Sequence, residues 1–79
     1  MITQSQIQEK LALAIKKSGY TQTALAQILG IKQPTIGQYI SGRAMPSLDT
    51  FANLCVALNI EPSEILGTKI YTTPTNTND

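Results

Sequence analysis

Glycines at positions 19, 30, 42 and 67 divide this chain into short segments, and their spacing limits the possible fold more than any other feature. Each follows a stretch whose apolar residues recur every three or four positions, the period of a helix that buries one stripe. Glycine commonly ends helices because it adopts the left-handed conformation without strain. The sequence therefore predicts an all-α fold of short helices, which must stabilise one another by packing because helices below about 12 residues are marginal alone.

Five helices are predicted from this punctuation. The first follows a cap at Thr3 or Ser5, where a glutamine three positions later can complete a capping box. The first is expected to end at Gly19, and the others are expected at residues 22–29, at about 33–41, after a cap at Ser47 to near Asn59, and at 62–66. Pro34 is compatible with its helix because a proline in the first turn lacks only an N–H that has no partner there. Residues 1–67 are thus predicted to form one domain, and residues 68–79 a polar C-terminal tail that is largely disordered.

The apolar period also predicts which side chains face the core. Ile36 and Ile40 are expected to anchor the third helix, with Tyr39 on its flank in half-buried packing rather than in contact with a base. The other expected core residues are Ile7, Leu11, Ala14 and Ile15 in the first helix, Leu25, Ile28 and Leu29 in the second, and Leu48, Phe51, Ala52, Cys55 and Leu58 in the fourth. Cys55 is interpreted as a small core residue rather than a redox sensor.

The composition excludes several classes of protein. With 79 residues the chain can hold one small core, and its single cysteine cannot form an internal disulfide. No apolar run approaches the roughly 18 residues of a membrane span and no signal peptide is recognisable, so a cytoplasmic protein without membrane contact is predicted. Histidine is absent and the five acidic residues are scattered, so we expect no enzyme activity, metal site or cofactor. No small-molecule ligand is evident, since phosphate-binding glycine loops are missing.

The stretch from residue 21 to residue 42 carries the strongest functional signal. It predicts two short helices joined by the three-residue turn Gly30-Ile31-Lys32, which is a helix-turn-helix unit whose second helix can enter the major groove of double-stranded DNA. At 100° per residue, the face opposite the apolar anchors presents polar and small side chains. These are Pro34, Gln38 and Ser41, with Thr35 and Gly37 at the margins and Gln33 at the exposed tip. Glutamine can bond adenine at two atoms, and threonine can contact the thymine methyl group.

The charge distribution is consistent with this interpretation but is not specific. Residues 1–45 carry five cations against one acid, for a net charge of +4, whereas residues 46–79 carry one cation against four acids, for −3. Such asymmetry also occurs on ordinary solvated surfaces. Lys16 and Lys17 can be read either as phosphate contacts or as an exposed helix end.

Two stretches, "TQTALAQILGIKQPTIGQYISG" and "PSLDTFANLCVALNIEPSEIL", resemble the lambda-repressor-like (Xre-type) helix-turn-helix proteins over about residues 5–67. The resemblance implies a five-helix DNA-binding domain with the helix-turn-helix at its second and third helices. It also implies that Gln22 binds a phosphate while supporting Gln33, that Gln38 reads a base, and that Arg43 contacts a phosphate.

The chain departs from this family at two places. Ile15 and Ile40 occupy positions where many members have a paired arginine and glutamate, and we interpret this as an ion pair exchanged for an apolar one, which removes the desolvation of two charges. Lys32 stands where the family usually has a capping serine or threonine. It is assigned to phosphate contact, with a solvated lysine as the alternative.

The sequence as a whole predicts a sequence-specific transcriptional regulator, a repressor that binds a palindromic operator as a homodimer. By analogy with the family, the acidic end would form the dimer through the apolar residues Ile60, Leu66, Ile70 and Tyr71. The alternative is an antitoxin-like or adaptor protein-interaction module on the same fold. A further possibility is that the chain is the DNA-binding part of a longer repressor.

Overall fold

The fold consists of five short helices, as the glycine spacing predicts. A computed structural model describes residues 1–68, and every regular element in that range is an α-helix. The helices are α1 (Gln4–Lys17), α2 (Gln22–Leu29), α3 (Gln33–Ser41), α4 (Leu48–Leu58) and α5 (Pro62–Leu66). Residues 68–79 were predicted to be a largely disordered tail. Residues 69–79 lie outside the described part of the chain, so this stays a prediction.

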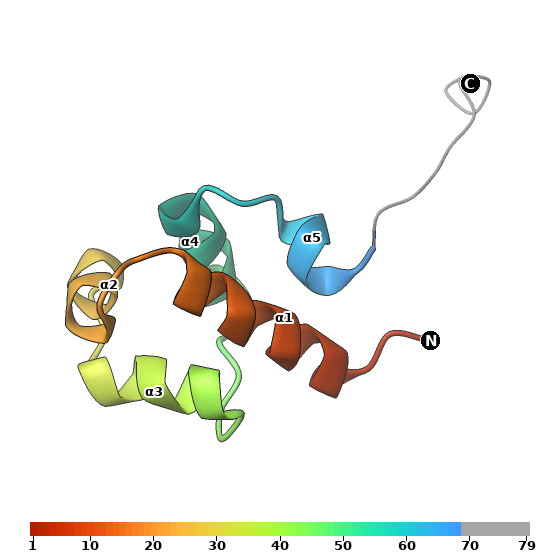
Figure 1. Cartoon of the computed structure of the whole chain (residues 1–79), viewed down its shortest axis with the longest axis horizontal. Coiled ribbons are helices and arrows are strands. Elements are labelled where there is room, and N and C mark those ends of the chain that lie inside the picture. The colour runs from red at the N-terminus through yellow and green to blue at the C-terminus, as the bar shows by residue number, and fades with distance from the viewer. Residues whose placement is uncertain (69–79) are drawn as a thin grey trace.

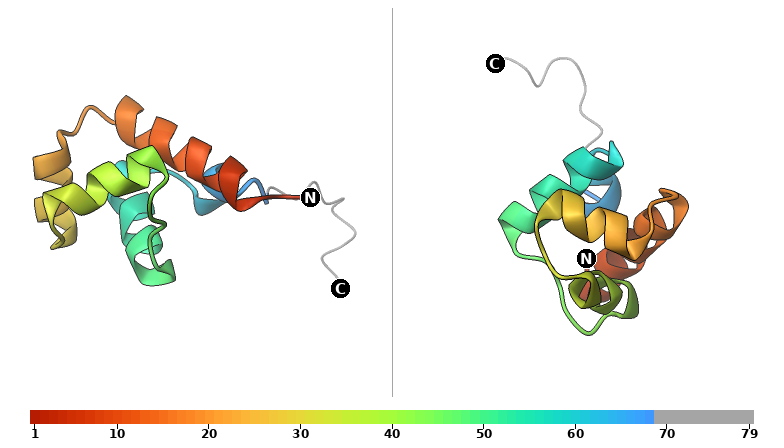
Figure 2. Two further views of the ribbon diagram at one scale, coloured as in Figure 1. Left: turned by 90° about the horizontal axis from the view of Figure 1, so that it is seen from below. Right: turned by 90° about the vertical axis from the view of Figure 1, so that its left-hand side faces the viewer.

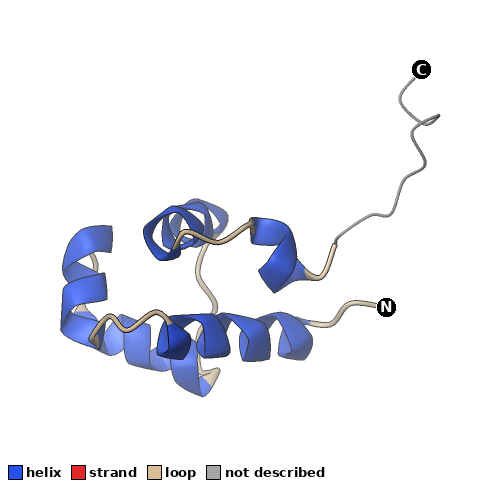
Figure 3. Cartoon of the chain, turned by 45° about the horizontal axis from the view of Figure 1, so that its top comes forward, coloured by secondary structure: helices blue, strands red, loops and turns tan. Residues whose placement is uncertain are grey.

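α1 is the central helix of the domain. It packs against α3 on one side and α5 on the other, while α2 contacts both α3 and α4. Figure 1 shows α3 below α1, α4 and α5 above it, and α2 at one end of the molecule. Figure 3 shows that the connections between the helices are short loops. No helix among residues 1–68 is long and apolar enough to cross a membrane.

Local signals in the sequence set the helix ends. Thr3 and Gln6 form the predicted capping box, with Gln6 N donating to Thr3 Oγ1 at 3.2 Å and Thr3 N donating to Gln6 Oε1 at 2.9 Å. Thr21 Oγ1 accepts from the amide of Ala24 at 3.0 Å and starts α2. Ser47 is the N-cap residue of α4, but its hydroxyl donates to Asp49 Oδ1 at 2.6 Å and does not accept from a backbone amide. Capping by short polar side chains satisfies amides that the helix itself cannot.

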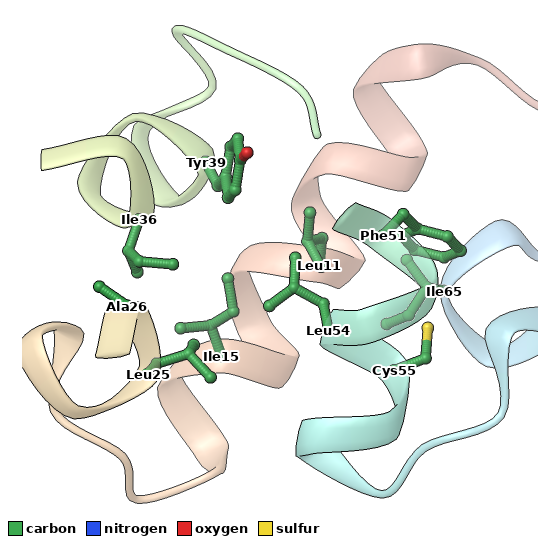
Figure 4. Close-up of a cluster of buried hydrophobic side chains, with 10 residues drawn as sticks. All are labelled: Leu11, Ile15, Leu25, Ala26, Ile36, Tyr39, Phe51, Leu54, Cys55 and Ile65. Carbon is green, nitrogen blue, oxygen red and sulfur yellow. The ribbon is translucent and has the colours of Figure 1, made fainter. Parts of the chain in front are cut away.

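One apolar cluster joins all five helices. Figure 4 shows Leu25 and Ala26 of α2 facing α1 and α3, with Leu54 of α4 close to Leu11 of α1. Leu11, Leu25, Ile36 and Leu54 are fully buried, each with 0% of its surface exposed. Burial of one such side chain stabilises a fold by about 1.5–3 kcal/mol, so the cluster compensates for helices that are individually too short.

The predicted anchors of α3 need one correction. Ile36 is fully buried as expected, but Tyr39 is the second anchor, with 6% of its surface exposed, and Ile40 is only partly buried. A helix buries either the residue three positions on or the one four positions on, depending on the side from which its neighbours approach, and the periodicity does not decide between them. Burial raises the pKa of the Tyr39 phenol, and the negative charge of Asp49 adds to this effect.

Three further core predictions were wrong. Ile28 in α2 is 55% exposed, Leu48 in α4 is 87% exposed, and Ala52 is exposed as well. In α4 the buried stripe runs through Phe51, Leu54 and Cys55 instead. At 100° per residue Ala52 lies about 110° from the centre of that stripe and points away from the core. Leu48 lies about 70° from the centre, at the margin of the stripe, and it is the first residue of α4.

The predicted exchange of an ion pair for an apolar pair is compatible with the packing. Ile15 is buried, with 2% of its surface exposed, and Ile40 packs against the same cluster. Both positions are therefore in apolar surroundings, where a charge would need desolvation. A direct contact between the two side chains stays a prediction.

Candidate nucleic-acid interface

α2 and α3 form a helix-turn-helix unit with a tight turn. Gly30 ends α2 with φ of 70°, and the amide of Ile31 donates to the carbonyl oxygen of Ala26 at 3.0 Å. This left-handed glycine turns the chain within three residues, so that α3 starts at Gln33. The buried residues Leu25 and Ile36 then join the two helices to the common core. Their inward positions determine which side of α3 faces outward.

The outward face of α3 carries the side chains that the helical period predicts. Gln33, Pro34, Gln38 and Ser41 are exposed, whereas Thr35 and Gly37 are partly buried at its margins. In the left view of Figure 2, taken from below, α3 lies in front of the other helices. The face offers hydrogen-bond donors and acceptors but no carboxylate, so it can approach a polyanion without like-charge repulsion.

The glutamines that begin α2 and α3 are hydrogen bonded to each other. Gln33 Nε2 donates to Gln22 Oε1 at 2.7 Å on the exposed edge of the unit. The same Gln22 oxygen lies beside Gly37, where an added Cβ would approach it to 3.4 Å. In this arrangement the amide nitrogen of Gln22 keeps both hydrogens for another acceptor, while Gln33 keeps its oxygen and one hydrogen. The hydrogen bond therefore fixes which atoms of the two side-chain amides remain free to donate and which remain free to accept.

Two cationic residues flank the polar face. Lys32 is the exposed N-cap residue of α3, and its side chain makes no capping hydrogen bond. Arg43 is exposed just after the helix, and its amide donates to the carbonyl oxygen of Gln38 at 3.0 Å. The first turn of α3 contains no acidic residue. The positive end of the helix dipole and the Lys32 charge thus favour an anion at the same place.

Sequence reasoning missed one residue that supports this face. Gln8 in α1 is partly buried, and its Nε2 donates to the carbonyl oxygens of Tyr39 at 3.1 Å and Ile40 at 3.0 Å. Gln8 lies three residues before Leu11 and seven before Ile15, so it belongs to the buried stripe of α1. A polar residue within that stripe is the signal that could have identified it.

The comparisons with known proteins agree with this geometry. The pattern of the helix-turn-helix family HTH_3 matches residues 11–65. The SOS-response transcriptional repressor LexA from Eubacterium rectale has a TM-score of 0.74 and 26% identity, covering 100% of this chain and 90% of that chain. The restriction-modification controller protein C.AhdI from Aeromonas hydrophila has a TM-score of 0.66 and 28% identity, covering 76% of this chain and 91% of that chain.

A transcriptional regulator from Listeria innocua shares the fold, with a TM-score of 0.69 and 21% identity over 91% of this chain and 67% of that chain. No curated protein sequence matches the chain significantly. The family pattern covers the turn, both of its helices and most of the core around them. On this basis the chain belongs to the HTH_3 family of lambda-repressor-like (Xre-type) helix-turn-helix proteins.

Proposed function

We propose that the protein is a sequence-specific transcriptional repressor that inserts α3 into the major groove of a palindromic operator. The observation that carries the proposal is the Gln33–Gln22 hydrogen bond of 2.7 Å at the start of an outward, uncharged polar helix face. A major groove is wide enough for one helix and displays a distinct pattern of donors and acceptors for each base pair. Such a role on DNA accords with the cytoplasmic location expected from the sequence.

Base recognition is assigned to the polar side chains of α3. The free oxygen and remaining N–H of Gln33 match N6 and N7 of adenine, and Gln38 can make the same bidentate pairing at another base pair. Thr35 at the margin can contact a thymine methyl group. Pro34 and Gly37 carry short or no side chains, which allows the helix backbone to approach the duplex closely.

Phosphate binding is assigned to residues around that face. The two free hydrogens of Gln22, the ammonium of Lys32 and the guanidinium of Arg43 are donors suited to phosphate oxygens. The hydroxyl of Ser41 donates to the carbonyl oxygen of Gln38 at 3.2 Å, so it is left with acceptor capacity on the groove face. We expect about 2 to 3 such phosphate contacts in each subunit, or about 4 to 6 in a dimer. The logarithm of the binding constant would then fall by ~0.9 per phosphate contact for each tenfold rise in salt concentration, which is a shallow dependence.

A homodimer is part of the proposal because one α3 offers few base contacts compared with the many non-specific sites of a genome. Two copies would read half-sites about 34 Å apart, one helical turn of DNA. Of the apolar residues expected at the dimer interface, Ile60 and Leu66 are partly buried, while Ile70 and Tyr71 lie outside the described residues. Ile60 lines a hollow of about 420 Å³ together with Leu13 and Leu58.

The proposal is tested with two variants that should fail differently. Gln38→Ala should lose discrimination at one base pair, by ~1–3 kcal/mol, while Arg43→Ala should weaken binding to all sequences alike and lower the salt slope by about 1. Selection of bound duplexes from a random pool, followed by titrations at several salt concentrations, measures both. An unchanged base preference in Gln38→Ala would refute the assignment of α3 to the groove.

A further inference from the structure

Gln8 connects α1 to the C-terminal end of α3 by a pair of hydrogen bonds. Its Nε2 lies 3.1 Å from the Tyr39 carbonyl oxygen and 3.0 Å from that of Ile40. Both belong to the last four residues of α3, whose carbonyl groups accept no hydrogen bond from an N–H of the same helix. Because a side-chain amide nitrogen carries two hydrogens, one glutamine can donate to both.

The turn after α3 is shaped around this side chain. Gly42 has φ of 85°, and a Cβ built there would lie 3.2 Å from Cδ of Gln8. In the same turn the amides of Gly42, Arg43 and Ala44 donate to the carbonyl oxygen of Gln38, at 3.0, 3.0 and 3.3 Å. Glycine at position 42 therefore meets two requirements, a left-handed backbone and room for Gln8.

These contacts mean that α3 is fixed at both of its ends by glutamines from other helices. Gln22 of α2 accepts from Gln33 at the N-terminal end, and Gln8 of α1 donates at the C-terminal end. Buried Tyr39 also holds this half of α3 in the core, but Gln8 is the side chain that fixes the last carbonyl groups of the helix relative to α1. The residues most affected by its loss would be Gln38 and Arg43, which lie nearest the end that Gln8 contacts.

We propose that Gln8 is a positioning residue for DNA readout, which sets the orientation of the C-terminal half of α3 without itself touching DNA. The inference rests on the proposed function of α3 as the groove-reading helix. Recognition groups need to be held within about 0.5 Å of their productive positions, so a loss of this support should reduce selectivity.

The surroundings of Gln8 separate this role from one in stability alone. Gln8 is only partly buried, and with Gly42 and Met45 it lines a hollow of about 290 Å³ that is open to solvent. Water can therefore hydrate the two carbonyl groups when the glutamine donors are removed. The main loss on substitution is then the fixed geometry of the helix end.

The test uses Gln8→Met, which keeps the length of the side chain but has no donor, in the full chain. Gln27→Met is the matched control, since Gln27 is an exposed glutamine in α2. In the free protein, hydrogen exchange at the amides of Gly42, Arg43 and Ala44 should become about tenfold faster in Gln8→Met only, with Ile31 as the unchanged internal reference. Preference for the base pair read by Gln38 should fall about tenfold, while affinity for random duplex should stay within about twofold.

Both measurements are made at a temperature where circular dichroism shows each variant fully folded. A loss of global stability alone would speed exchange at Ile31 as well, so the unchanged Ile31 amide separates a local effect at the end of α3 from a global one. Unchanged exchange at these three amides, or a base preference equal to that of the wild type, overturns the inference. A second variant, Gln8→Glu, has the shape of glutamine without its donors when ionised, and normal exchange in it would also contradict the role of the hydrogen bonds. If the wild type itself selects no sequence, the proposed function fails, while the exchange experiment still judges Gln8.

Discussion

The outward faces of α3 and α4 differ although the two helices bury similar inward faces. Ile36 and Tyr39 of α3 and Leu54 and Cys55 of α4 belong to the same apolar cluster. Outward, α3 presents glutamines and a serine, whereas α4 presents Leu48 and Val56, which are 87% and 80% exposed. A methyl group cannot distinguish hydrogen-bonding patterns, so the face of α3 offers more groups for reading base edges than these two side chains of α4 do. The comparison separates positions that specify the fold from positions that are available for binding.

The largest expected effects are on stability and concern the core that α3 and α4 share. There, substitutions in the two helices should cost similar free energies of unfolding. Ile36→Ala in α3 and Leu54→Ala in α4 each truncate a fully buried side chain. Each should lower the free energy of unfolding by about 2–5 kcal/mol, a large part of the stability of so small a domain. Urea unfolding followed by circular dichroism measures both. A cost below about 1 kcal/mol in either variant would show that its helix is not integral to the common core.

An intermediate effect should reveal the difference between the outward faces. Gln38→Glu on α3 and Asn53→Asp on α4 each replace an exposed amide by an acid of nearly the same shape, and both change the net charge by −1. The first places a negative charge against the phosphates and removes a donor, so affinity for any duplex should fall at least tenfold, or about 1.4 kcal/mol. Asn53→Asp should stay within about twofold. Equal losses in fluorescence-anisotropy titrations would mean that net charge rather than the face of α3 governs binding.

The sequence predicts local structure better than it predicts the orientation of side chains. Helix ends depend on caps, glycines and prolines that act within a few residues, and all five helices were predicted, with their ends within about two residues. The first helix shows the remaining error, because its C-cap is Ser18 and not Gly19. The buried stripes depend on how helices meet, and this explains why Tyr39 replaced Ile40 as an anchor and why Leu48 was misplaced.

The same limit applies to the candidate site. The outward positions of Gln33 and Gln38 followed from periodicity alone, because the opposite side of α3 is clearly apolar. The contact between Gln8 and the end of α3 joins residues 31 and 32 positions apart, and no local pattern specifies such a pair. A polar residue within an apolar stripe indicates that some partner exists, but it does not identify the partner.

The smallest expected effect contrasts the N-terminal ends of the two helices. α4 has an acidic residue, Asp49, in its first turn, whereas α3 has none and leaves its positive end available for an external anion. Hydrogen bonds from the Ser47 hydroxyl, the Thr50 amide and the amide of Asp49 itself hold the pKa of the Asp49 carboxyl below its usual value of 3.8. The carboxylate of Asp49 therefore already places a negative charge at the positive N-terminal end of α4.

Because the pKa of Asp49 is lower in the folded than in the unfolded chain, its contribution to stability is complete above the unfolded pKa and is lost as pH falls through the folded pKa. Asp49→Asn should consequently be slightly less stable than the wild type at pH 7, and the difference should shrink below pH of about 4 as the wild-type carboxyl becomes protonated. Thermal unfolding of both proteins across this range measures the difference. A gap that stays constant with pH would indicate that shape or hydrogen bonding at Asp49 matters rather than its charge, and the contrast between the two helix ends would then lose its electrostatic basis.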